Sequence, residues 1–322
     1  MSNLKVVTIT LNPALDLTGH LVDQLNVGSV SLVSKNTLHP AGKGVNVAKV
    51  LSDLGADVTV TGFLGSDNQE PFCQLFEQIK ATDCFVRVSG ATRINVKLVD
   101  KASDVSDINF PGVEVSQTAI EAFEATLEEL ANDHDYFVMA GSLPRGISPE
   151  LCAKWIESLH QKGKKVIFDS SRQALKAGLN SHPWLIKPND EELAELVGKE
   201  LHSIEDCQQA AQTLESKGID NIVVSMGAKG VMWLNQGKWL QAEPPKMDVV
   251  STVGAGDTLV AGLTWGHLSR DSDKENWPQE KVLSFATALS ALAVTQIGVG
   301  VPDLTPVNNL QQKIRIQATS RI

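Results

Sequence analysis

Residues 249–266, VVSTVGAGDTLVAGLTWG, contain the pattern with the clearest chemistry. A strand-like run ends in the small residues Gly254, Ala255 and Gly256, and Asp257 then opens a helical pattern. Small residues let a backbone approach a ligand closely, and the free N–H groups of a helix start favour negative charge. Asp257 lies in the first helical turn, where a carboxylate either caps the helix or acts as a general base. The segment therefore predicts an anion-binding turn with a candidate base.

A second glycine turn occupies residues 37–47, TLHPAGKGVNV. Gly42 and Gly44 again lead into a helical pattern, and Lys43 and Asn46 supply hydrogen-bond donors. A lysine at a glycine-rich helix start indicates a phosphate or polyol site. The turn is not a P-loop, because G-x-x-x-x-G-K-[ST] is absent from the chain, as are G-x-G-x-x-G and G-x-S-x-G.

A parallel sheet must position these turns. Short β-branched runs alternate with amphipathic segments, which predicts strand–helix–strand repetition with helices on both faces of the sheet. The predicted strands span 5–10, 57–65, 135–142, 164–171, 184–189 and 221–227. The predicted helices span 43–55, 68–80, 116–131, 148–162, 189–198 and 204–217, and the chain from 255 onward is mostly helical. In such sheets ligands bind beyond the carboxyl ends of the strands.

Two stretches, 17–38 and 84–110, break this rhythm with alternating apolar and polar residues. We interpret them as a small antiparallel β lid, and residues 1–16, 39–83 and 111–322 as the large α/β catalytic domain. The alternative is that both are ordinary edge strands of the main sheet. In the second stretch Ile94, Val96 and Leu98 alternate with Arg93, Asn95 and Lys97, which predicts one apolar and one polar face.

Composition narrows the class of protein. The 322 residues carry a formal net charge of −10 with no Lys/Arg-rich run, so we expect neither a nucleic-acid nor a membrane partner. The four cysteines are scattered, which argues against a disulfide framework or a zinc site. The N-terminus opens on a strand-like run without the layout of a signal peptide, so the expected location is the cytoplasm.

Taken together, these motifs resemble the ribokinase-like family of carbohydrate kinases. The resemblance runs nearly from end to end, through TLNPALD (10–16), AGKGVN (41–46), TRIN (92–95), GSLP (141–144), KPN (187–189), SMGAKG (225–230) and VGAGD (253–257). The phosphohexose kinase branch is the most similar, because Ser251 stands where many kinases of unphosphorylated sugars have Asp. The implied fold is a mostly parallel sheet with helices on both faces and a β lid.

The resemblance implies roles for individual residues. Asp257 would be the base, and the Gly254, Ala255 and Gly256 backbone would bind the transferred phosphoryl group. The sugar would be held by Asp16, Gly42, Lys43, Asn46, Arg93, Asn95 and Ser142. ATP would lie against Lys187, Asn189, Ser225, Gly227, Gly230 and Gly256. Asn189 and Glu192 would position Mg²⁺, largely through water.

The implied activity is ATP-dependent phosphorylation of a phosphohexose, with fructose 1-phosphate as the first candidate. Tagatose 6-phosphate, fructose 6-phosphate and an uncharged sugar or nucleoside stay open as alternatives, and so does a non-catalytic sugar-phosphate sensor. Lys43, Arg93 and Lys97 could offset the substrate's phosphate, since a buried anion needs partners. The resemblance also implies a homodimer through the apolar faces of two lids. Packing of that face on the chain's own large domain is the alternative.

Overall fold

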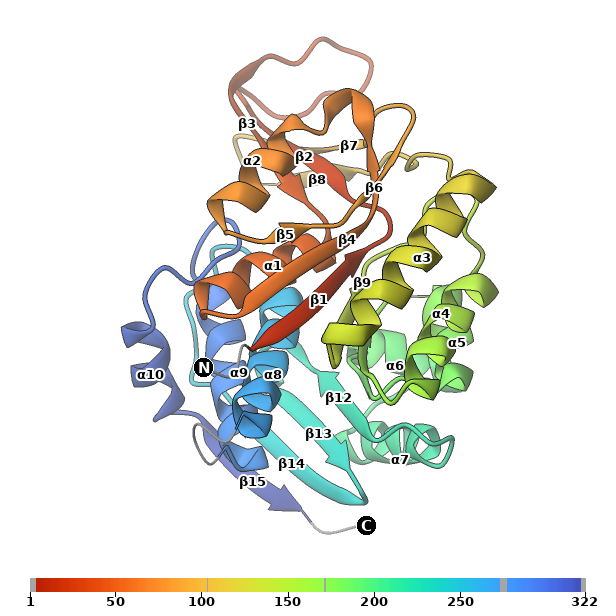
Figure 1. Cartoon of the computed structure of the whole chain (residues 1–322). Coiled ribbons are helices and arrows are strands. Elements are labelled where there is room, and N and C mark those ends of the chain that lie inside the picture. The colour runs from red at the N-terminus through yellow and green to blue at the C-terminus, as the bar shows by residue number, and fades with distance from the viewer. Residues whose placement is uncertain (1–3, 103, 171, 273–276, 320–322) are drawn as a thin grey trace.

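Figure 1 shows the computed structural model, which describes residues 4–102, 104–170, 172–272 and 277–319. The ends of the predicted large domain, residues 1–3 and 320–322, lie outside this range. So do residues 103 and 273–276 and Ser171, the last residue of the strand predicted at 164–171.

The helices predicted between 43 and 217 begin and end close to the predicted residues, and α5 is a further helix that was not predicted. The described helices are α1 (Lys43–Asp53), α2 (Glu70–Gln78), α3 (Gln117–Asp133), α4 (Pro149–Gln161), α5 (Arg172–Gly178), α6 (Asp190–Val197), α7 (Ile204–Glu215), α8 (Ala255–Asp271), α9 (Gln279–Ala293) and α10 (Thr305–Gln311). Serine side chains cap three of them: Ser116, Ser148 and Ser203 each accept a backbone N–H from the first turn.

The described residues form a large sheet of eleven strands in the order β15-β14-β13-β12-β11-β10-β9-β1-β4-β5, with β6 also paired to β4. The strands are β1 (Lys5–Thr10), β4 (Asp57–Gly65), β5 (Thr82–Asp83), β6 (Val86–Val88), β9 (Tyr136–Ala140), β10 (Lys165–Asp169), β11 (Leu185–Ile186), β12 (Asn221–Ser225), β13 (Val231–Asn235), β14 (Lys238–Glu243) and β15 (Arg315–Thr319). The neighbouring strands β12, β11, β10, β9, β1 and β4 pair parallel in this order, and β5 and β6 each pair parallel with β4. This mostly parallel sheet confirms the predicted fold class.

The antiparallel part of this sheet was not predicted. β12, β13, β14 and β15 pair antiparallel at one edge, and β15 interrupts the helical C-terminal region. The signal for the hairpin is Gln236-Gly237, which joins β13 to β14 with positive φ at both residues, 50° and 72°. Such a two-residue turn matches the twist of an antiparallel pair.

A separate sheet of four strands forms from most of the two alternating stretches, but β6, which was predicted with the lid, pairs with β4 of the large sheet. The four-stranded sheet has the order β3-β2-β7-β8, built from β2 (Ala14–Leu21), β3 (Val33–Ala41), β7 (Ile94–Val99) and β8 (Val105–Ile108). The outer pairs are antiparallel as expected, but the central pair β2–β7 is parallel. The chain passes through the large sheet between these two strands, so β7 can enter in the same direction as β2. We call this four-stranded sheet the lid, and the division of the chain into domains stays a prediction.

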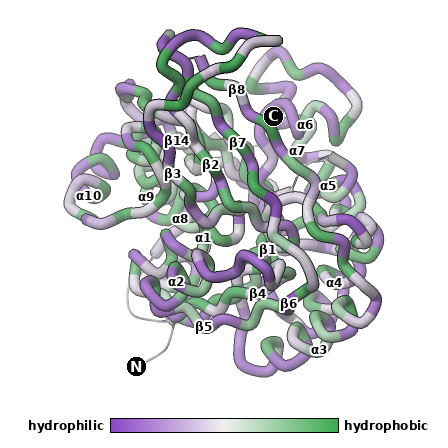
Figure 2. Tube along the Cα trace, turned by 90° about the horizontal axis from the view of Figure 1, so that it is seen from above, coloured by the Kyte–Doolittle hydropathy of each residue, from purple (hydrophilic) through white to green (hydrophobic). Residues whose placement is uncertain are grey.

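The lid has two chemically distinct faces. Leu17, Val96, Ile108 and Leu38 stand in one row across the four strands, while Asp16, Asn95 and His39 stand in the neighbouring row on the opposite face. Figure 2 shows hydrophobic and hydrophilic residues interleaved along β7. Among the apolar residues, Leu38, Ile94 and Ile108 are 44%, 40% and 47% exposed. In the single chain this face is therefore not covered by the large domain.

Helices cover both faces of the large sheet (Figure 1). One core contains buried residues of α1, α2, α8 and α9, and the other contains those of α3, α4 and α7. Alternation along β1 divides them, because Val6 belongs to the first core while Val7 and Ile9 belong to the second.

Helix α8, which carries Asp257, is anchored to the sheet at its far end. Its last residue, Asp271, accepts hydrogen bonds from the Tyr136 hydroxyl at 2.7 Å and from Lys165 Nζ at 2.5 Å. Tyr136 and Lys165 are the first residues of β9 and β10. The position of α8 is thus tied to the strand β10, whose other end is Asp169.

Candidate active site

Both predicted glycine turns lead into helices with uncapped starts. Gly254 precedes α8 with φ 82°, and Gly42 precedes α1 with φ 131°, and no described side chain caps either helix. A Cβ at Gly254 would lie 2.3 Å from Val299 Cγ2, and one at Gly42 would lie 2.8 Å from Thr10 Cγ2. Glycine is required at both positions. At the start of α8 the Ala255 N–H donates to Thr252 O at 3.3 Å, so the N–H groups of Gly254 and Gly256 are the ones left for an anion.

Asp257 lies in the first turn of α8 and is only 6% exposed. Its Oδ2 accepts a hydrogen bond from Asn46 Nδ2 at 2.7 Å, which joins the two glycine turns across 211 residues of sequence. Burial, and after it the nearby carboxylate of Asp169, raises the pKa of Asp257 to about 6, against the opposing effects of Asn46, Lys43 and Lys187. A carboxyl with this pKa can accept a proton near neutral pH.

Asp169 was not among the predicted site residues, although it lies near the end of the strand predicted at 164–171 and is the last residue of β10. It is 1% exposed, and its Oδ1 lies 3.3 Å from Lys43 Nζ and 3.5 Å from Lys187 Nζ. Its Oδ2 has no hydrogen-bond partner among the described residues. Burial opposes the charge on Lys43, but Asp169, Asp257 and Glu192 outweigh it and raise the pKa of this lysine. Two lysines and two carboxyls thus share one site, in which Asp169, Asp257 and Lys187 are buried and Lys43 is partly exposed.

The parallel topology explains why residues so distant in sequence meet here. Asp169 ends β10, Lys187 follows β11, Ser142 lies two residues after β9 and Ser225 ends β12. These four strands are neighbours and run in the same direction, so their carboxyl ends share one edge of the sheet.

Asn189 and Glu192 form a capping box at the start of α6. Asn189 Oδ1 accepts the Glu192 N–H at 2.7 Å, and Glu192 Oε2 accepts the Asn189 N–H at 3.0 Å. The capping box engages one Glu192 oxygen, and Asp169 Oδ2 has no hydrogen-bond partner in the described part of the chain. The carboxylates of Glu192 and Asp169 fit water bound to Mg²⁺. No group of three or more His, Cys, Asp or Glu side chains suited to a metal lies among the described residues.

Three of the predicted nucleotide residues, Ser225, Gly227 and Gly230, lie at the turn after β12. Ser225 N donates to Pro188 O at 3.1 Å, and Gly227 and Gly230 have φ of 56° and 95°. A Cβ at Gly230 would lie 2.0 Å from Ala242 O, so this glycine is required by packing against β14.

An exposed apolar strip near the α8 turn was not predicted. Val249, Val250 and Val253 precede the turn and are more than half exposed, and Ile297, after α9, is 85% exposed. The two segments lie side by side, because Val250 N donates to Val294 O at 2.7 Å. Apolar side chains beside an anion-binding turn suit a nucleotide, which has a flat base and a charged tail.

On the polar face of the lid, Asp16 and Asn95 are neighbours across β2 and β7. Asn95 Nδ2 donates to Asp16 Oδ1 at 3.2 Å, and Asn95 Oδ1 accepts the Phe110 N–H at 3.3 Å. The alternation of the sequence predicted this face, but not the hydrogen bond between the two strands.

Arg93, which directly precedes β7, connects the lid to residues that follow β1 and β9 of the large sheet. Its Nη2 donates to Asn12 O at 2.9 Å and to Ser142 Oγ at 3.4 Å, its Nε donates to Pro13 O and its Nη1 to Phe110 O, both at 3.3 Å. Burial lowers the pKa of Arg93, with Asp16 opposing. Asn12, which was not predicted, also donates from Nδ2 to Ser142 Oγ at 3.1 Å.

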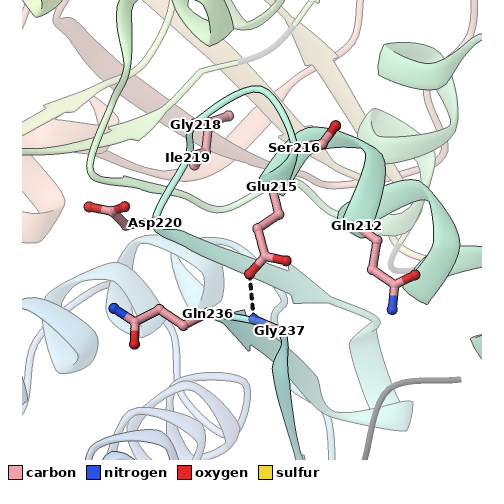
Figure 3. A pocket seen from close by; sticks show the side chains of 8 residues that line it. All are labelled: Gln212, Glu215, Ser216, Gly218, Ile219, Asp220, Gln236 and Gly237. Carbon is pink, nitrogen blue, oxygen red and sulfur yellow. Dashed lines mark hydrogen bonds between the residues drawn. The ribbon is translucent and has the colours of Figure 1, made fainter.

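A hollow of about 570 Å³ opens at the opposite edge of the sheet (Figure 3). It is lined by Gln212, Glu215, Ser216, Gly218, Ile219, Asp220, Gln236 and Gly237. In Figure 3 the Glu215 carboxylate accepts the Gly237 N–H, at 2.7 Å. The lining has two carboxylates and no cationic side chain, so it does not suit a phosphorylated ligand.

None of the described helices is long and apolar enough to cross a membrane.

Comparisons with known proteins agree with this geometry. Residues 9–306 match the pfkB family carbohydrate kinase model. The chain is 68% identical over 314 residues to the 1-phosphofructokinase of Vibrio cholerae, covering 98% of this chain and 97% of that protein. It is 46% identical to the 1-phosphofructokinase of Escherichia coli, with 97% and 98% covered. Among solved structures, phosphofructokinase-2 from Escherichia coli in complex with fructose-6-phosphate superposes with a TM-score of 0.86 at 26% identity, covering 96% of this chain and 98% of that one.

Proposed function

The chain belongs to the pfkB family of carbohydrate kinases, and we propose that it transfers the γ-phosphoryl group of ATP to the 6-hydroxyl of fructose 1-phosphate. The product is fructose 1,6-bisphosphate. Identity of 68% over nearly the whole chain to a 1-phosphofructokinase supports this substrate. The observation that carries the chemistry is the buried Asp257 at the free N-terminus of α8, beside Lys43 and Lys187.

In the proposed reaction Asp257 is the general base. It accepts the proton of the 6-hydroxyl as the bond from O6 to the γ-phosphorus forms and the bond to the ADP oxygen breaks. A pKa of about 6 leaves most of Asp257 unprotonated at neutral pH and still gives it affinity for the proton. Asn46 holds the carboxylate through Oδ2, which leaves Oδ1 for the substrate hydroxyl.

Charge on the transferred group is offset by donors already in place. The N–H groups of Gly254 and Gly256 lie at the start of α8, and the Nζ atoms of Lys43 and Lys187 lie 3.3 Å and 3.5 Å from Asp169 Oδ1. Both lysines have N–H donors left for phosphate oxygens. When bound, Mg²⁺ supplies further positive charge to the phosphates, and Asn189, Glu192 and Asp169 are the residues that would hold it through water.

The lid holds the sugar and excludes water. Asp16 and Asn95 present a carboxylate and an amide on the polar face, which suits hydroxyl groups. Exclusion of water protects the phosphoryl group from hydrolysis.

We further propose that the enzyme is a cytoplasmic homodimer. The apolar lid face, with Leu38, Ile94 and Ile108 exposed, would pack against the same face of a second chain. An isologous contact of this kind covers both faces at once.

A kinetic panel tests the substrate. Purified protein with Mg-ATP is assayed for ADP release with fructose 1-phosphate, fructose 6-phosphate, tagatose 6-phosphate and fructose. We expect kcat/KM to be highest for fructose 1-phosphate. A higher value for either 6-phosphate would replace the proposed substrate by that sugar, and no turnover with any of them would make the protein a sensor.

A further inference from the structure

Arg145 lies in the segment between β9 and α4, three residues after Ser142. Its side chain is exposed, and its Nε donates to Gly112 O at 3.2 Å. Its two Nη groups have no hydrogen-bond or ion-pair partner within the described residues. One edge of the guanidinium is therefore anchored, and four N–H donors remain for a ligand.

Arg93, the arginine that the sequence places in the sugar site, does not have this freedom. It donates once from Nε, once from Nη1 and twice from Nη2, so four of its five N–H donors are used within the chain. A bidentate grip on phosphate needs two parallel N–H groups. Arg93 retains a single free N–H, so a phosphate beside it needs donors from another side chain.

The two guanidinium groups are anchored on the same short segment. Arg93 binds the carbonyl of Phe110 and Arg145 binds that of Gly112. Two residues of extended chain span at most about 7 Å, so both arginines belong to one small region.

Asn12 joins this region to Ser142. A Cβ at Gly112 would lie 2.0 Å from Asn12 Oδ1, so the two residues are in direct contact. Asn12 Nδ2 donates to Ser142 Oγ at 3.1 Å and to Leu143 O at 3.2 Å. The segment from Ser142 to Arg145 is therefore held against Asn12 and Pro13, whose carbonyls also accept hydrogen bonds from Arg93.

We propose that Arg145 binds the phosphate already present on the sugar substrate, with Arg93 as a fixed neighbouring donor, and so selects phosphorylated over free sugar. This inference rests on the proposed function, because it assumes a phosphohexose acceptor. A planar guanidinium with two free Nη groups matches two phosphate oxygens, and its charge offsets the anion.

Steady-state kinetics of Arg145→Ala test the role. Arg145 is exposed, so the variant folds normally, and its urea midpoint should equal that of the unmodified protein. We expect the KM for fructose 1-phosphate to rise about 10–100-fold, with the KM for ATP within about twofold, as for a lost charge-assisted hydrogen bond. Turnover of fructose, which has no phosphate, should not change. Arg145→Lys should recover part of the loss, since it keeps the charge without the planar fork.

Arg315→Ala is the matched control, because Arg315 is also exposed but lies on the edge strand β15. It should leave the KM for fructose 1-phosphate, the KM for ATP and the turnover of fructose unchanged. An unchanged KM for fructose 1-phosphate in Arg145→Ala, or equal losses with fructose and fructose 1-phosphate, would overturn the inference. If the unmodified protein prefers another sugar phosphate, the proposed substrate is wrong. The KM of Arg145→Ala is then compared with that of the unmodified protein for the preferred sugar phosphate.

Discussion

Asp257→Asn should inactivate the enzyme and at the same time stabilise the fold. The raised pKa of Asp257 means that the native state holds this carboxylate at a cost. A shift from 3.8 to about 6 corresponds to about 3 kcal/mol, at about 1.4 kcal/mol per pKa unit. Asn has no charge to bury and still presents an oxygen to Asn46, so the substitution removes the cost and keeps the hydrogen bond.

The sign of the pH dependence follows from the direction of the shift. The pKa of Asp257 is higher in the folded than in the unfolded chain, so the penalty is absent below about pH 4 and complete above about pH 6. The free energy of unfolding of Asp257→Asn should exceed that of the unmodified protein by about 3 kcal/mol at pH 7.5 and by about 1 kcal/mol at pH 4.5. The gain should therefore shrink on acidification.

Urea unfolding followed by tryptophan fluorescence at these two pH values measures the difference. In parallel, kcat of the variant should fall by roughly 10²–10⁴-fold, the usual share of a general base. Asp248→Asn is the control, because Asp248 is exposed, and it should change stability at neither pH. Near-normal turnover in Asp257→Asn would reduce Asp257 to a residue of the helix start. A variant that is no more stable at pH 7.5 would refute the account of its pKa.

Three further predictions concern Asp169, Arg93 and the apolar face of the lid. Asp169→Asn removes a charge that raises the pKa of Asp257, so the acid limb of kcat/KM, near pH 6 in the unmodified enzyme, should move to lower pH; an unmoved limb would contradict the coupling. Arg93→Ala should raise the KM for the sugar phosphate about 10-fold or more and the KM for ATP little, and equal changes in both would argue against a sugar-side role. Leu98→Asp or Val96→Asp, both on the apolar lid face, should convert a micromolar dimer to monomer in light scattering; a monomeric unmodified protein with full activity would exclude the dimer.

Local pattern was sufficient for much of the fold. The helix predicted at 148–162 forms over 149–161, and the strands predicted at 5–10 and 57–65 have these bounds. The alternation of Ile94, Val96 and Leu98 correctly separated one lid face from the other. These features depend on the spacing of apolar residues within one element, and the sequence displays that spacing directly.

The site residues fall into two groups: those visible in the local sequence and those whose role depends on distant contacts. Gly254 and Gly42 were singled out because small residues directly before a helical pattern are visible in the local sequence, and the structure adds that both have positive φ. Asp169 was missed, because an aspartate at a strand end is common and its importance comes from two lysines, one of them 126 residues away. Arg93 was found, but the use of its donors on three backbone carbonyls was not visible.

The sequence by itself therefore determined the class of fold and located the two glycine turns, and it named Asp257 as the candidate base. Tertiary structure alone decided which charges meet, and with them the pKa of Asp257 and the donors left on each arginine. The physical reason is the separation along the chain between the residues that interact. Secondary structure follows from contacts within a few residues, whereas burial and electrostatic coupling depend on groups that the parallel strands bring to one edge of the sheet.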